Sequence, residues 1–129
     1  MVSEPFVVVT RTRVKPGKAE EASAWLRRFC DLVKEREPRI LAFHTYSDEE
    51  GRLTGTVQVH PDAESMEFHF RAMGEELTAM HEYLDEVVSV ELFGTPSETV
   101  LRGVSRYQDI LSVMPVHTGG VTRLAGLIP

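Results

Sequence analysis

Hydrophobic and polar residues follow two different periods along residues 1–95. Residues 6–14 and 84–93 are rich in valine, which favours pleated, half-buried strands. Residues 18–37 carry apolar side chains at spacings of three and four, which predicts an amphipathic helix that ends before a proline. A second stripe of this kind predicts another helix over residues 62–80, although one glycine within it weakens the helix.

Two further strands are predicted at residues 40–47 and 52–60, on either side of a short acidic turn that ends in glycine. A type I turn followed by a left-handed glycine predicts a hairpin in which paired residue numbers sum to 100. That register separates an apolar face from a polar face, and a one-residue slip would mix them. The apolar face would hold Leu41, Phe43, Leu53, Val57 and Val59, and the polar face His44, Tyr46, Thr54, Thr56, Gln58 and His60.

The predicted order is strand, helix, strand, strand, helix, strand. This is the split βαβ or ferredoxin-like arrangement of the α+β class, in which two helices cover one face of an antiparallel sheet. The other face then needs a partner. We expect a homodimer in which a second copy covers it, with His44, Tyr46, Thr56 and Gln58 at the contact.

The chain divides into this domain at residues 1–95 and a C-terminal extension at residues 96–129. Ser97 suits the cap of a short helix that would end near Tyr107. Residues 110–116 and 121–128 have the pattern of short strands, and either a hairpin or an arm exchanged across a dimer fits them. We expect the extension to add to the dimer contact.

The composition excludes several function classes. The 129 residues include 14 Lys+Arg and 20 Asp+Glu, and a net charge of −6 disfavours nucleic-acid binding. No apolar stretch is long enough for a membrane helix, and the first residues lack the pattern of a signal peptide, so we expect a cytoplasmic protein without membrane contact. Cys30 is the single cysteine, which permits no internal disulfide and no thiolate zinc site.

Segments of residues 6–95 resemble the antibiotic biosynthesis monooxygenase (ABM) domain of the dimeric α+β barrel superfamily. The segments are 6–10 with 14–18, the hairpin 43–51, the strand-to-helix junction 57–63 and the closing strand 90–94. These segments are strands, turns and junctions between elements, so they specify the fold better than the chemistry. The resemblance implies a homodimer whose sheets form a shared barrel, and a pocket in each subunit between sheet and helices.

Members of this family differ in activity. Some oxidise aromatic polyketides or quinols with molecular oxygen and no metal or flavin, some cleave haem, and others have no known activity. The haem-cleaving members share an asparagine, tryptophan and histidine pocket, but this sequence has no asparagine and its only tryptophan, Trp25, lies on the first predicted helix. The resemblance therefore implies a cofactor-independent monooxygenase of a small aromatic or quinol-like molecule. The alternative is a non-catalytic homodimer that binds a small ligand or is associated with stress.

Cofactor-free oxygenation requires a site that binds a flat ring, excludes water and moves a proton, and histidine suits the last task. His69 borders the apolar stripe of the second predicted helix, so it is the candidate catalytic residue, although such a histidine can also simply keep its polar edge in water. Aromatic and methionine stripes are usually core, but they can also wall a ring-binding site. The candidate substrate-binding residues are Trp25, Phe29, Phe43, Phe70, Met73 and Tyr83.

The histidine spacing predicts no metal site. The proposed register puts His44 and His60 about four residues apart on the hairpin, roughly 13 Å. His69 and His81 face different sides of their helix. The sequence also lacks a glycine-rich nucleotide loop and a nucleophile elbow, so we expect no cofactor.

Overall fold

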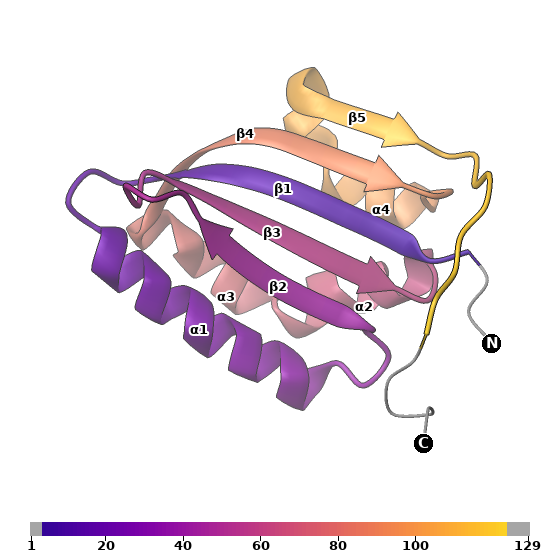
Figure 1. Ribbon diagram of the computed structural model, residues 1–129, viewed down its shortest axis with the longest axis horizontal. Coiled ribbons are helices and arrows are strands. Elements are labelled where there is room, and N and C mark those ends of the chain that lie inside the picture. Colours follow the sequence, from indigo (N-terminus) through magenta and orange to yellow (C-terminus); the bar gives the residue numbers. More distant parts are fainter. Residues whose placement is uncertain (1–3, 124–129) are drawn as a thin grey trace.

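Five strands form a single sheet, and the helices pack over one of its faces (Figure 1). This computed structural model describes residues 4–123. The strands are β1 (Phe6–Val14), β2 (Ala42–Ser47), β3 (Leu53–His60), β4 (Leu84–Phe93) and β5 (Leu111–Met114). The helices are α1 (Ala19–Arg36), α2 (Ala63–Ala72), α3 (Gly74–Ala79) and α4 (Glu98–Gly103), with 3₁₀ turns η1 (Met80–Glu82) and η2 (Ser105–Ile110). The sheet order is β2-β3-β1-β4-β5, and neighbours are antiparallel except for the β4–β5 pair.

The elements from β1 to β4 confirm the predicted ferredoxin-like α+β class. The apolar stripe of α1 faces the sheet, because Trp25, Phe29 and Val33 are all buried. The second predicted helix is divided, however. Met73 has a non-helical backbone (φ −112°, ψ 15°), so α2 ends there and α3 begins at the glycine that follows. Within the described part of the chain, no helix is both long enough and apolar enough to cross a membrane.

The predicted hairpin register is wrong by one residue. Paired residue numbers sum to 101, so Phe43 pairs with Gln58 rather than with a valine. The turn fits this register through Asp48, whose backbone N–H donates to the Leu53 carbonyl (3.1 Å) and whose Oδ1 accepts hydrogen bonds from the backbone N–H groups of Arg52 (2.9 Å) and Leu53 (3.3 Å). Asp48 therefore caps the turn instead of pairing with Arg52.

This shift changes which residues of β2 and β3 share a face. Residues that pair directly share a face, so Phe43 lies with Gln58, and the polar residues of β3 lie with the inner residues of β1. Thr12 pairs with Thr54, and Thr10 with Thr56, on the face toward the helices. The outward side chains of these two strands include the half-buried valines Val7, Val9, Val57 and Val59.

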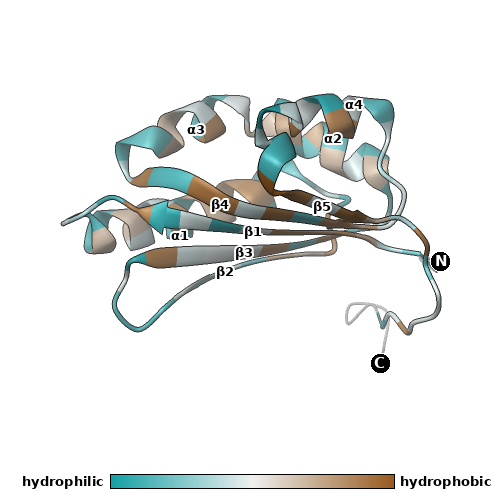
Figure 2. Cartoon of the chain, turned by 90° about the horizontal axis from the view of Figure 1, so that it is seen from above, coloured by the Kyte–Doolittle hydropathy of each residue, from teal (hydrophilic) through white to brown (hydrophobic). Residues whose placement is uncertain are grey.

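The uncovered face of the sheet carries these half-buried valines, while Phe6, Val8, Val90 and Leu92 are buried on the covered face. Figure 2 shows the sheet near its edge, with α2, α3 and α4 on one side of it. His44 and Tyr46 lie on that outer face, whereas Thr56, Gln58 and His60 face inward, which corrects the prediction that these residues share a face. A homodimer across the outer face stays a prediction.

The described part of the extension folds back onto the domain. α4 begins as predicted at Ser97, whose Oγ accepts a hydrogen bond from the backbone N–H of Val100 (3.1 Å). β5 then pairs with β4 in parallel at the edge of the sheet. Residues 121–123 form no strand, and the remainder of the strand predicted at 121–128 lies outside the described residues.

Replacing the capping side chain tests the origin of the register. We expect Asp48→Ala to lower the free energy of unfolding by about 1 kcal/mol, because two backbone donors lose their acceptor. Urea denaturation of the wild type and of Glu49→Ala, an exposed neighbour in the same turn, provides the comparison. Equal loss in both variants would contradict a specific role for Asp48.

Candidate functional site

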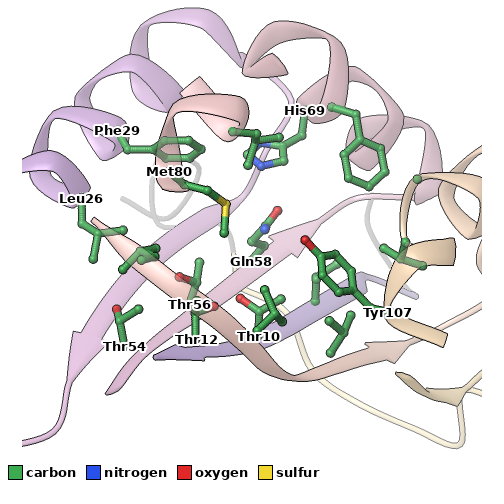
Figure 3. A pocket seen from close by; sticks show the side chains of 18 of the residues that line it. Thr10, Thr12, Leu26, Phe29, Thr54, Thr56, Gln58, His69, Met80 and Tyr107 are labelled. Atoms are coloured by element: carbon green, nitrogen blue, oxygen red, sulfur yellow. The ribbon is translucent and has the colours of Figure 1, made fainter. Parts of the chain in front are cut away.

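A cavity of about 360 Å³ lies between the inner face of the sheet and the helices (Figure 3). This volume is in the range of small-molecule sites. The polar part of the cavity floor consists of Thr10, Thr12, Thr54, Thr56 and Gln58, and the apolar residues Val8 and Phe43 of the sheet also line the cavity. The roof and walls come from α1, α2, α3, η1, β4, α4 and η2 and are mostly apolar. The cavity is therefore two-sided, with hydrogen-bonding groups below and apolar groups above.

A buried carboxylate and a buried imidazole meet at the roof of this cavity. Glu37 follows the last residue of α1, four positions after Val33, and so continues the inward stripe of that helix. His69 lies in the last turn of α2. The distance from His69 Nδ1 to Glu37 Oε2 is 2.6 Å, and the two side chains are only 2% and 1% exposed. Because carboxylate oxygens accept, Nδ1–H donates to Glu37 and Nε2 is left to the cavity, which His69 lines.

The buried carboxylate of Glu37 depends on its hydrogen bond to His69. A buried carboxylate is costly unless hydrogen bonds compensate for its lost hydration. Oε1 of Glu37 has no hydrogen-bond partner among the described residues, so the bond to His69 is the compensation that the structure provides. A proton taken up at Nε2 would place a positive charge beside this carboxylate, which would stabilise it.

A second hydrogen-bonded chain orients the polar floor. His60 Nδ1 lies 2.7 Å from Ser65 Oγ, and His60 Nε2 lies 2.9 Å from Gln58 Oε1. Burial, together with the nearby His69, lowers the pKa of His60 to about 4, so its imidazole is neutral at ordinary pH. Its Nε2–H then donates to the Gln58 carbonyl, which leaves the amide NH₂ of Gln58 as a donor at the cavity surface.

Aromatic rings surround the His69 imidazole. Its ring centroid lies 6.0 Å from that of Phe29, 5.8 Å from that of Phe43 and 6.5 Å from that of Phe70. Trp25 packs on Phe29 at 5.4 Å and also lines the cavity. The imidazole is thus held in a place from which bulk water is excluded.

The structure brings five of the seven predicted site residues together around the cavity and leaves two outside its lining. The lining includes Trp25, Phe29, Phe43, His69 and Phe70. Met73 is instead fully buried in the core between α1 and the sheet. Tyr83 packs against Trp25 at a ring distance of 5.8 Å. The functional roles given to all seven stay predictions.

The extension closes one side of the cavity. Tyr107 of η2 lines it, and Figure 3 shows its hydroxyl pointing into the cavity, toward the region of Gln58. Gly103 of α4 lies against Phe70, where an added Cβ would be 2.5 Å from Cε2 of that ring. Glycine is thus required for this close approach of α4 to α2. The sequence analysis missed this contribution because nothing in residues 96–129 indicated which face they would cover.

Other reactive groups are dispersed. Among residues 4–123, no three His, Cys, Asp or Glu side chains lie close enough together to hold a metal ion. Burial raises the pKa of the Cys30 thiol, which disfavours its nucleophilic thiolate form. Within the described chain, the Glu37–His69 pair is thus the strongest candidate for chemistry.

No model of a known protein family matches this sequence, and no curated protein matches it in sequence. Several solved structures do share its fold. MupZ from Pseudomonas fluorescens matches with a TM-score of 0.76 and 15% identity, over 100% of this chain and 96% of that chain. A structure from Chloroflexus aurantiacus that carries the antibiotic biosynthesis monooxygenase name matches with a TM-score of 0.59 and 12% identity, over 92% and 99% of the two chains. One from Caulobacter crescentus with the same name matches with a TM-score of 0.61 and 20% identity, over 70% and 89%.

The chain therefore has an ABM-like fold. The MupZ match covers the full chain, whereas the Caulobacter match covers 70% of it. At these identities the likeness concerns the fold and carries no residue roles with it. The chemistry has to be argued from the cavity.

The lowered pKa of His60 predicts how stability depends on pH. The unfolded chain binds a proton near the ordinary pKa of 6.5, whereas the folded chain binds it only near 4. Stability is therefore complete above about pH 6.5 and falls as the pH decreases toward 4. From pH 6.5 to 5 we expect the wild type to lose about 1.5 kcal/mol more than His60→Gln does. Urea denaturation at the two pH values measures both losses, and parallel losses would refute a neutral, buried His60.

Proposed function

We propose that this protein is a cofactor-independent monooxygenase of a small aromatic or quinol-like molecule, with His69 as the general base. The observation that carries the proposal is the 2.6 Å hydrogen bond between His69 Nδ1 and Glu37, combined with an Nε2 that faces a cavity of about 360 Å³. A histidine held in one tautomer by a carboxylate is a common arrangement for proton abstraction. The proposal is also supported, less specifically, by the fold that this chain shares with structures named for monooxygenase activity.

The proposed reaction uses the chain to move one proton and to exclude water. His69 Nε2 accepts the proton of a ring hydroxyl, and Glu37 stabilises the resulting imidazolium. The electron-rich phenolate then transfers electrons to dioxygen, and a ring carbon forms a bond to oxygen. The O–O bond breaks, the ring C–H proton is lost, and the departing oxygen leaves as water. The phenol and O₂ thus yield a quinone and H₂O, so the ring is oxidised and dioxygen is reduced.

The lining of the cavity supports a ring-containing substrate with more than one oxygen. The aromatic roof around Phe29 and Phe70 suits the faces of a flat ring. The threonine hydroxyls of the floor can rotate to donate or accept, and the Gln58 amide donates. Together they provide partners for several hydroxyl or carbonyl groups along one edge of the molecule.

A second candidate function is binding without catalysis. The polar floor favours this function, because its four threonines and one glutamine can form hydrogen bonds to a ligand but are not catalytic groups. In that case the Glu37–His69 pair would recognise a ligand hydroxyl and leave it unreacted. We further propose that the protein acts in the cytoplasm as a homodimer joined through the valine-rich outer face of the sheet.

Oxygen consumption tests the catalytic proposal. We expect chelator-treated protein to consume O₂ with at least one member of a panel of hydroquinones and polycyclic phenols. Replacing the base by His69→Ala should lower kcat at least about 100-fold. Glu37→Gln should also lower kcat, because a neutral amide stabilises the imidazolium less well, and the thermal unfolding of each variant shows whether it folds.

The matched control is Glu35→Gln, which makes the same change at an exposed position of α1. It should leave the rate unchanged. Tight binding of a panel member without oxygen consumption would favour the binding function. Uptake that persists in His69→Ala would remove His69 from the mechanism.

A further inference from the structure

The cavity has a charge character opposite to that of the whole chain. The protein carries a net charge of −6, yet no Asp or Glu is found among the described residues that line the cavity. The ionisable side chains in the lining are His69, His81, Arg106 and Tyr107. The lining therefore carries one permanent positive charge and no carboxylate, although the buried carboxylate of Glu37 lies behind His69.

That positive charge belongs to Arg106, at the mouth of the cavity. The exposed residues of the lining are Thr78, His81, Gly103 and Arg106, so they mark where the cavity opens to solvent. Arg106 forms no ion pair with any described carboxylate. Its neighbour Arg102, by contrast, lies 3.7 Å from Glu98.

The side chain of Arg106 also contacts the ring of Tyr107. Its guanidinium carbon lies 6.0 Å from the centroid of the Tyr107 ring, the geometry of a cation–π contact. Tyr107 in turn directs its hydroxyl into the cavity (Figure 3). η2 thus presents a guanidinium at the mouth and a hydroxyl inside it. A guanidinium fork matches the two oxygens of a carboxylate.

We propose that the substrate is a ring-containing carboxylic acid whose carboxylate binds Arg106 at the mouth while its ring enters toward His69. This deepens the proposed function and rests on it for the reacting ring hydroxyl. It also assigns a role to the C-terminal extension, because α4 and η2 supply the charged end of the site. The Thr10–Thr56 region of the floor then receives the oxygens between the two ends.

Binding of matched ligands tests the proposal without any turnover. We would titrate the protein with 6-hydroxy-2-naphthoate and with 6-hydroxy-2-naphthamide, which differ in the charge of one group, and measure Kd by isothermal calorimetry. We expect the carboxylate to bind about tenfold more tightly than the amide. The preference should decrease in 0.5 M salt, because an exposed ion pair is screened.

Variants locate the preference. Arg106→Gln should bind acid and amide equally, whereas Arg106→Lys should retain part of the preference. Arg102→Gln is the matched control, because Arg102 is an exposed arginine of α4 outside the cavity lining, and it should behave as the wild type. Equal affinities in the wild type, an unchanged preference in Arg106→Gln, or no binding of the acid at millimolar concentration would each overturn the proposal.

The binding experiment tests the carboxylate site independently of the oxygenase proposal. Binding of the acid through Arg106 without oxygen consumption would retain the carboxylate site and reject the oxygenation. Oxygen consumption that depends on His69 but shows no preference for acids would do the reverse.

Discussion

A single buried hydrogen bond connects the two helices that roof the cavity. Glu37 ends α1, and His69 lies on α2, so their contact joins segments 32 residues apart in sequence. A carboxylate that is 1% exposed requires a partner, and the imidazole supplies it. The same bond fixes which nitrogen of His69 carries the proton and which one meets the cavity. The proposed chemistry depends on this contact, while Arg36 adds a second link between the two helices through the carbonyl of Ala72 (3.0 Å).

The inner face of the sheet beneath this pair is divided between a core and the cavity floor. Phe6, Val8, Val90 and Leu92 are buried against the helices. The threonines of β1 and β3 and Gln58 line the cavity, where a ligand can bind them, and His60 holds Gln58 in its orientation. Val7, Val9, Val57 and Val59 point outward.

The sequence was sufficient to predict the order of the elements and most of their boundaries, because hydrophobic periodicity and proline positions determine both. It was insufficient for the hairpin register, since the turn depends on hydrogen bonds of the Asp48 side chain that a turn pattern does not reveal. The predicted register therefore placed Thr56, Gln58 and His60 of β3 on the wrong face, whereas His44 and Tyr46 lie on the outer face as expected. His69 was found because it borders an apolar stripe. Glu37 was missed, although its spacing of four from Val33 places a charge on the inward stripe of α1, which was the available signal.

The protonation of His69 is the property that most directly tests this account. Nitrogen-15 chemical shifts from long-range ¹H–¹⁵N correlation spectra of the folded protein, assigned by comparison with His69→Asn, report the state of each ring nitrogen. The account predicts a protonated Nδ1, hydrogen bonded to Glu37, and an Nε2 that carries no proton. A proton on Nε2 beside an unprotonated Nδ1, which is the other neutral tautomer, would contradict the assignment of His69 as the base.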